Sequence, residues 1–233
     1  MDDRLIGRAA FLGVLGTGVA GLFVGQEALR ALTRLLPDEV NAVAPTDGWR
    51  IFTIGPSMPT YDPATFRLRV AGHVDRPLSL RLDDLRGLPR TEQVSDFHCV
   101  TGWSVRDVHW EGVRLRDLLD AAGPRQGAVS LRFLSAERPY EDSLLLQQAL
   151  LDDVLLADVM DGGPLSRPHG APLRVVMPRM YGYKSVKWVE AIEIRTDVVT
   201  GYWERRGYDS DAWIANVPEL PGGPRSGAPG VGA

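Results

Sequence analysis

The sequence predicts an α+β protein in which mixed sheets are joined by short helices and long loops. Three observations predict this class. Apolar and polar residues alternate in several short runs, as in half-buried strands. The 25 glycines and 17 prolines predict many turns and argue against long helices outside the N-terminal region. The composition, with 44% hydrophobic and 24% charged residues, is that of a packed globular domain.

The first half of the chain predicts strands and short helices in alternation. Apolar residues alternate with arginines over residues 66–70, which predicts a strand with one buried face. A β-rich run follows at 91–97. Helical spacing predicts short helices at 82–88, ahead of a proline, and at 115–122, ahead of a Gly-Pro pair.

The second half is dominated by strand patterns. We expect strands at 129–133, at 172–178 and, most strongly, at 186–194, where Val and Ile recur around a tryptophan. Residues 147–151 predict a short helix, and 154–160 fit either a strand or a helix. No internal repeat is visible. The net charge of −4 gives no basic field that would suggest nucleic-acid binding.

The N-terminal 36 residues differ from the rest. Arg4 and Arg8 precede the uncharged run 9–26, which has the length of a marginal membrane span or of the apolar region of a signal peptide. It passes into a segment of helical period at 27–36. We expect an uncleaved hydrophobic helix that anchors the protein to the membrane at its extracytoplasmic face. An exported form and a core or dimerisation helix are the alternatives.

The chain therefore divides into four parts. Residues 1–36 form the hydrophobic helix, and 37–48 are a linker containing Pro, Asp, Asn and Gly. Residues 49–217 form the domain. The tail at 218–233 is rich in Pro, Gly, Ser and Ala, and we expect it to be disordered.

Cys99 is the only cysteine, and it lies where the β-rich run meets a Gly-Trp loop. One thiolate cannot build a zinc or iron–sulfur cage, which needs several ligands. It suffices when a metal arrives with its other ligands attached, as part of an organic cofactor. A small buried hydrophobe is the alternative interpretation.

Two further segments suit an anion. Lys184, Ser185 and Lys187 lie in a glycine-containing loop, and ammonium groups, a hydroxyl and backbone N–H groups together suit a phosphate. His169 lies in a Pro/Gly loop before a predicted strand that carries Arg174. A buried arginine is costly unless it meets an anion or a carboxylate. A solvated basic turn and a structural ion pair are the alternatives.

Aromatic residues gather near both ends of the domain, where they form either plain core or the mouth of a site. They are Trp49, Phe52, Tyr202, Trp203, Tyr208 and Trp213.

In their order and spacing, these segments resemble the molybdopterin-binding domain of the sulfite oxidase family. They are most similar to its bacterial single-domain branch, that of the methionine sulfoxide reductase catalytic subunit. The resemblance spans roughly residues 49–213. It is carried by residues 97–104 (FHCVTGWS), 110–113 (WEGV), 169–174 (HGAPLR) and 181–188 (YGYKSVKW).

The resemblance implies a mixed-sheet, sulfite oxidase-like fold and a molybdenum–molybdopterin cofactor. Cys99 would be the thiolate ligand to molybdenum, and Trp103 and Tyr208 would line the substrate mouth. The implied cofactor-binding residues are Phe52, Thr53, Ile54, Cys99, Thr101, His169, Arg174, Gly182, Tyr183, Lys184, Ser185 and Lys187.

The chain departs from the family's pattern near the substrate. Sulfite oxidases place an arginine shortly after the cysteine, where this chain has Ser104, and carry an arginine and a histidine near Ile54 and Pro56, where it has neither. The methionine-sulfoxide branch has an acidic residue at the position of Thr101. A sulfite dianion would therefore find little positive charge.

The expected function is that of a molybdopterin-dependent oxidoreductase. It would move an oxygen atom between water and a small S- or N-oxide, cycling Mo(VI) and Mo(IV), with reduction favoured over oxidation. The sequence has no Cys-x-x-Cys-His haem motif, so a membrane haem protein or quinol-linked subunit would exchange electrons with it. The alternatives are a sulfite-oxidising enzyme, a non-catalytic molybdopterin-binding electron-transfer subunit of a membrane complex, and a scaffold without cofactor.

Overall fold

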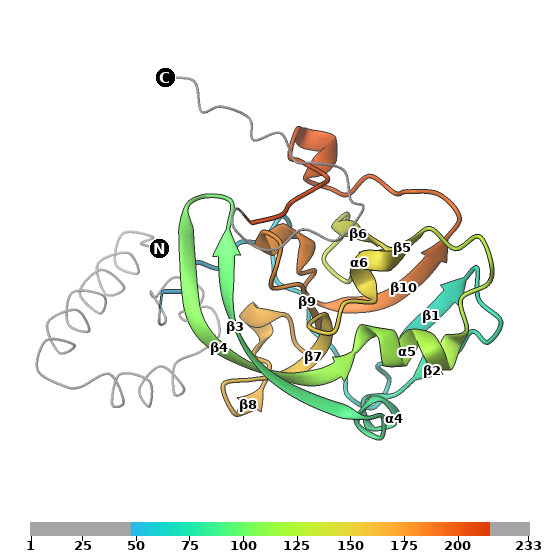
Figure 1. The fold of residues 1–233 in the computed structure, drawn as a ribbon. Helices are drawn as coiled ribbons and strands as arrows, with labels where there is room; N and C mark the ends of the chain where they lie inside the picture. Colours follow the sequence, from blue (N-terminus) through green and yellow to red (C-terminus); the bar gives the residue numbers. More distant parts are fainter. Residues whose placement is uncertain (1–47, 215–233) are drawn as a thin grey trace, which may run out of the picture. The chain divides into compact units, whose positions relative to one another are not determined.

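The structure, a computed structural model, describes residues 48–214, and the compact unit that contains the candidate site begins at Phe52. Figure 1 shows two β-sheets and a few short helices joined by long loops. The α+β class with mixed sheets is as predicted. The predictions of a hydrophobic helix at 1–36 and of a disordered tail at 218–233 fall outside the described residues. Within 48–214, no helix is both long and apolar enough to span a membrane.

The first sheet is mixed and has the strand order β2-β1-β10-β5-β6. β1 runs parallel to β10, and the other neighbouring strands of this sheet run antiparallel to each other. The last strand along the chain thus lies at the centre of the sheet, beside the first. The strands are β1 (Leu68–Gly72), β2 (Leu78–Leu80), β5 (Ser130–Ser135), β6 (Glu141–Leu145) and β10 (Val189–Arg195).

The second sheet is antiparallel and has the order β3-β4-β7-β8, and β9 pairs with residues 155–157 of β7, ahead of the 159–160 stretch that pairs with β8. Figure 1 shows β3 and β4 as a long curved hairpin. Its turn follows Cys99. The strands are β3 (Arg90–Cys99), β4 (Trp103–Arg114), β7 (Leu155–Met160), β8 (Gly163–Pro164) and β9 (Arg174–Val176).

The helices are short, as the glycine and proline content predicts. Helix α5 has the predicted bounds and ends at Gly123, whose φ of +68° is the left-handed conformation that glycine favours. The segment that fitted a strand or a helix is strand β7. The helices are α4 (Leu82–Arg86), α5 (Leu115–Ala122) and α6 (Leu146–Ala149), with 3-10 turns η1 (Arg167–His169), η2 (Gly182–Lys184) and η3 (Glu204–Arg206).

Both sheets contribute to one hydrophobic core. Val70, Phe133 and Ile192 of the first sheet and Val175 of the second are fully buried in it, together with Leu118 of α5. Burying large apolar side chains of this kind stabilises a fold by about 1.5–3 kcal/mol each. The shared core includes Val175 of β9 and Val186 of the loop before β10, and β3 is held by its pairing with β4. These segments carry the candidate site.

Candidate active site

Cys99 lies at the tight turn of the β3–β4 hairpin, opposite Trp103. Gly102 donates its backbone N–H to the Cys99 carbonyl at 3.0 Å and has a φ of +87°, which side-chain-bearing residues rarely adopt. The thiol is partly exposed, and its Sγ lies 3.1 Å from Thr101 Oγ1. The sulfur is therefore accessible at a strand end, where the sequence predicts a site.

Phe97, two residues before Cys99, joins the hairpin to the other predicted segments. Its ring centroid lies 5.8 Å from that of Trp103 and 5.4 Å from the Arg174 guanidinium carbon. The ring also packs on Gly182, since a Cβ built there would come within 2.1 Å of Phe97 Cζ. The structure thus brings together the cysteine strand, the arginine strand and the lysine-bearing turn.

Arg174 is almost fully buried, at 2% exposure, on β9. Its guanidinium lies over the Trp110 ring, 4.9 Å from the centroid, and donates to the His169 carbonyl at 3.2 Å. Burial lowers the pKa of Arg174 to about 10, which still leaves it charged at neutral pH. The predicted strand with an arginine inside is therefore confirmed.

Lys187 and His169 lie close to this guanidinium. The Lys187 ammonium donates to the carbonyls of Phe52 at 2.9 Å and Pro168 at 3.2 Å and lies over the Trp188 ring. Burial, and then repulsion by Arg174, lowers the pKa of Lys187 to about 7. Burial and the same two cations lower the pKa of His169 to about 3, so its imidazole stays neutral.

These groups fit an anionic cofactor. Among residues 48–214, the hydrogen-bond and ring partners of Arg174 and Lys187 are carbonyls and aromatic rings rather than carboxylates. A buried cation without a carboxylate partner is costly, and a bound phosphate would relieve that cost. Ser185 is buried beside them; its hydroxyl accepts the Met177 N–H, and its own proton remains for a further acceptor.

The segment at Phe52–Ile54 is held by a residue that sequence reasoning missed. Buried Glu137 accepts the backbone N–H groups of Ile54 at 2.7 Å and Gly55 at 3.2 Å. Phe52 is 56% exposed, and its ring stacks on Trp103 at 6.5 Å. Nothing in the local pattern distinguishes Glu137 from a surface carboxylate, because its partners lie more than 80 positions away.

The 58–59 segment is held by a second such residue. Arg167 donates to the carbonyls of Met58 and Pro59 and so ties this segment to η1.

Lys184 has an environment unlike that of Lys187. Its buried ammonium donates to Asp142 at 2.9 Å, to the Ser143 carbonyl at 3.1 Å and to Glu204. All three donors thus have partners within the protein. Its predicted contact with the cofactor stays a prediction.

Asp142 provides a test of this buried charge group. Burial raises the pKa of Asp142 to about 6; Lys184 opposes the shift and Glu204 adds to it. Because this value exceeds that of the unfolded chain, the folded protein binds an extra proton between about pH 4 and 6, and its stability falls as the pH rises through that interval. Asp142→Asn should abolish this loss, which is on the order of 3 kcal/mol.

Urea denaturation of the apo-protein from pH 4 to 7 measures the effect. The exposed Asp83, with a side chain 92% accessible, provides the matched control Asp83→Asn, whose pH profile should follow that of the wild type. Parallel profiles for Asp142→Asn and the wild type would contradict the assignment.

The remaining predicted residues lie around these groups. The Tyr183 carbonyl accepts the Tyr140 hydroxyl at 2.6 Å. Thr53 and Thr101 are exposed. The Tyr208 ring packs on Tyr183 and Trp203, whereas Trp103 lies on the cysteine hairpin itself. The roles of Tyr208 and Trp103 at a substrate mouth stay predictions.

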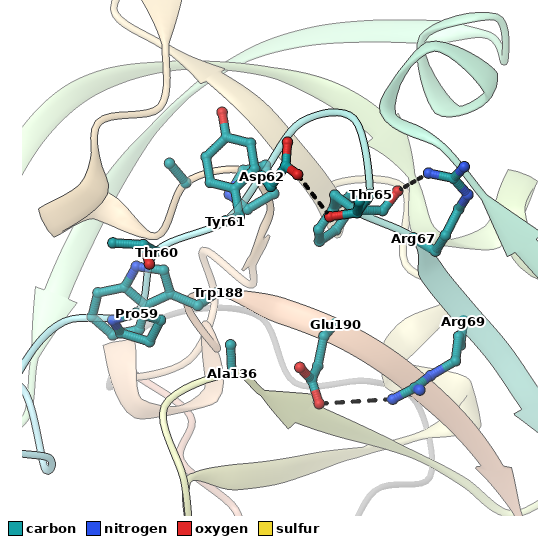
Figure 2. Close-up of a pocket in the computed structure, with 13 residues that line it drawn as sticks. Pro59, Thr60, Tyr61, Asp62, Thr65, Arg67, Arg69, Ala136, Trp188 and Glu190 are labelled. Carbon is teal, nitrogen blue, oxygen red and sulfur yellow. Dashed lines mark hydrogen bonds and ion pairs between the residues drawn. The ribbon is translucent and has the colours of Figure 1, made fainter.

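Figure 2 shows a separate cavity of about 320 Å³ that contains none of the predicted site residues. Trp188, next to Lys187 in the chain, and Pro172, close to His169, contribute to its lining. Its charged groups are largely engaged: Glu190 lies 3.7 Å from Arg69, and Asp62 accepts the Thr65 hydroxyl. The cavity therefore lies beside the candidate site but offers no comparable cation cluster.

Gly182 provides a steric test of the contact between the lysine-bearing turn and the cysteine strand. Gly182→Ala is expected to lower the free energy of unfolding by about 1–3 kcal/mol and to reduce cofactor content, because the new methyl group overlaps the Phe97 ring. Denaturant unfolding and molybdenum analysis measure the two effects. Phe97→Leu in the same chain should restore part of the stability by freeing that space.

Gly163→Ala is the matched control, since a Cβ there meets no atom within 4 Å. Equal effects of the two alanine substitutions would show that the contact between Gly182 and Phe97 does not constrain the site.

Two buried cations whose hydrogen-bond partners are carbonyls, and a partly exposed thiol on a neighbouring strand end, fit a protein that binds an anionic organic cofactor. The family described as "Oxidoreductase molybdopterin binding domain" matches residues 55–203, and the chain belongs to this family. Membership confirms the predicted family and implies the molybdenum–molybdopterin cofactor. The residues present fit that cofactor.

Three relatives show how broad the likeness is. The chain is 40% identical over 159 residues to "Uncharacterized oxidoreductase YuiH" of Bacillus subtilis, covering 67% of this chain and 80% of the relative. It is 28% identical over 173 residues to "Protein-methionine-sulfoxide reductase catalytic subunit MsrP" of Campylobacter jejuni, covering 67% of this chain and 58% of that relative. It is 30% identical over 199 residues to "Sulfite oxidase" of Arabidopsis thaliana, covering 67% of this chain and 51% of that relative.

A solved structure supports the fold. The sulfane dehydrogenase SoxCD from Paracoccus pantotrophus matches with a TM-score of 0.58 and 26% identity, covering 62% of this chain and 41% of that chain. The sulfite oxidase-like fold is therefore confirmed.

Proposed function

We propose that this oxidoreductase transfers an oxygen atom to or from a small S- or N-oxide and uses Cys99 as the protein ligand to molybdenum. The position of Cys99 carries the proposal. Its thiol is partly exposed, and it lies two residues from Phe97, whose ring contacts both the Arg174 guanidinium and the Gly182 turn. A soft thiolate at this point suits a metal already bound to sulfur.

The residues around the cysteine have separate roles. When bound, the cofactor supplies a metal that accepts or donates an oxygen atom together with two electrons. Arg174 and Lys187 neutralise its phosphate. Neutral His169 forms hydrogen bonds without adding charge, since burial lowers its pKa to about 3. Glu137 shapes the backbone at Ile54 and Gly55, along the edge of the cofactor.

The side chains near the thiol favour a neutral substrate. Phe52 and Trp103 stack on each other, and Val100, next to Cys99, is 42% exposed. Ser104 stands where sulfite oxidases carry an arginine, and its hydroxyl is engaged by His98 at 2.7 Å. An apolar rim with hydroxyl groups suits a sulfoxide or an N-oxide better than a sulfite dianion. Sulfite oxidation is the alternative.

The experiment is an assay of protein purified from a host that makes the cofactor. We expect about one molybdenum per chain and oxidation of reduced viologen in the presence of sulfoxides or N-oxides. Turnover of sulfite with an artificial electron acceptor, and not of oxides, would favour the alternative. Bound molybdenum without turnover of any substrate would favour a non-catalytic electron-transfer subunit.

We also propose that a membrane subunit exchanges electrons with this protein at the extracytoplasmic face. The apolar run at 9–26 supports an anchor. The names of two relatives, a reductase "subunit YedZ1" and a "catalytic subunit MsrP", support an additional subunit. Membrane fractionation of the full chain and of a variant lacking residues 1–36 tests this: the full chain should sediment with membranes, and the shortened one should not.

A further inference from the structure

Residues 200–214, which we call the C-terminal strap, are tied to the turn at 179–184 by four contacts. The ties are Ile214 N to the Arg179 carbonyl (3.0 Å), Tyr181 N to the Ala212 carbonyl (2.8 Å), the Tyr183 hydroxyl to the Asp209 carbonyl (2.7 Å), and the Lys184 ammonium to Glu204. The family match ends at residue 203, so every strap residue in these ties lies beyond it.

The tie between Lys184 and Glu204 is the most deeply buried of the four. The side chains of Lys184, Glu204 and Asp142 are 3%, 5% and 1% exposed. The second oxygen of Glu204 accepts the Gly201 N–H at 2.7 Å, which closes the strap on itself. In the low dielectric of a protein interior, removing one partner of such a cluster is far more costly than breaking a surface ion pair.

The tie acts next to the cofactor-binding residues. Lys184 is the last residue of η2; Ser185 follows it directly, and Lys187 lies three positions after it. The Ser185 carbonyl lies 3.5 Å from an Arg174 nitrogen, and Lys187 holds the Phe52 carbonyl. Any shift of the backbone at Lys184 is therefore passed along the chain to groups that face the cofactor.

Aromatic packing strengthens the same connection. Tyr208 of the strap lies edge-on to Tyr183, with ring centroids 5.5 Å apart, and Trp203 packs on Tyr208. Edge-to-face aromatic pairs contribute stabilisation beyond that of the area that they bury. The strap and the turn thus pack as one unit.

We propose that the C-terminal strap fixes the cofactor-binding turn and that Glu204 is the positioning residue through which it acts. Glu204, together with Asp142, holds the Lys184 ammonium inside the protein and so fixes the end of η2, from which the chain continues to Lys187. The inference rests on the family's cofactor and extends to strap residues that the family match does not cover.

The test compares Glu204→Ala with the wild type in two measurements made well below the unfolding temperature. Amide hydrogen exchange of the apo-protein should become about tenfold faster in residues 181–187, because a charge-assisted hydrogen bond is lost. Molybdenum and pterin should also leave the holoprotein about tenfold faster on dilution. Asp197→Asn, which removes an exposed carboxylate paired with Arg195, is the control and should change neither rate.

A merely structural role predicts a different pattern. Exchange would then rise equally in α5 and β10, and cofactor loss would follow the unfolding rate of the whole domain. That pattern, or rates equal to those of the control, would overturn the proposal. A wild-type protein without molybdenum would instead contradict the cofactor assignment, and hydrogen exchange in the apo-protein would still test the tie.

Glu204→Gln keeps the size of the side chain and one acceptor oxygen for Lys184, but the NH2 group that replaces the second oxygen cannot accept the Gly201 N–H. It should give intermediate rates even if Glu204→Ala fails to fold. Rates equal to the wild type in this variant would show that a neutral acceptor suffices and that the charge of Glu204 is not needed for the positioning.

Discussion

Cys99→Ser should leave the fold and the cofactor content close to those of the wild type, while oxygen-atom transfer falls by at least about a hundredfold. The two side chains differ by one atom, and Cys99 lies outside the buried core, so the substitution should change the free energy of unfolding little. A hard hydroxyl is a poorer ligand than a soft thiolate for a metal bound by sulfur. Viologen-linked turnover measures the rate.

Electron paramagnetic resonance of the Mo(V) state reports the sulfur ligand directly, and its signal should change in the same variant. Val94→Ala, at an exposed position of the same strand outside the candidate site, is the control and should retain the signal of the wild type. An unchanged Mo(V) signal in Cys99→Ser would show that the thiol is not a ligand.

Arg174→Met should move two measurements in opposite directions. The apo-protein should gain about 1–3 kcal/mol of stability, because a buried charge without a carboxylate partner is replaced by an apolar side chain of similar length. Methionine also packs well between aromatic rings such as those of Phe97 and Trp110. Cofactor affinity should fall at least about a hundredfold, because the phosphate loses a charge-assisted partner.

Denaturant unfolding of the apo-protein and molybdenum content after gel filtration measure the two effects. Arg69→Met removes an exposed arginine and should alter neither measurement by much. A loss of apo-protein stability in Arg174→Met would show that Arg174 is a structural residue, the alternative that the sequence left open. Such a result would remove the main support for an anion site at β9.

The sequence was informative where chemistry and local pattern coincide. An arginine inside an apolar strand predicted both β9 and a buried cation, because a guanidinium is rarely placed in a core without a reason. A lone cysteine between a β-rich run and a Gly-Trp loop predicted a thiol at a strand end, and Cys99 is the last residue of β3. Helix α5 was predicted with its exact bounds, since the Gly-Pro pair that ends it acts locally.

Long-range pairings were beyond sequence reasoning. Strand β4 was missed because its polar residues, such as Arg106, Asp107 and His109, obscure the alternation on the exposed side of the hairpin. The buried partners of Lys184 were missed because Asp142 and Glu204 lie 42 and 20 positions away and look like ordinary surface carboxylates. Spacing shows that a lysine is present but not which anion it meets.

The order of the first sheet has a consequence for biosynthesis. β10 lies between β1 and β5, so the earliest strand of the domain acquires its parallel neighbour only after Val189–Arg195 has left the ribosome. Lys187 lies two positions before that strand. A nascent chain that ends before Val189 contains the cations of the candidate site but lacks the completed sheet. The sheet that supports the candidate site is therefore completed late in the synthesis of the domain, once β10 has joined β1 and β5.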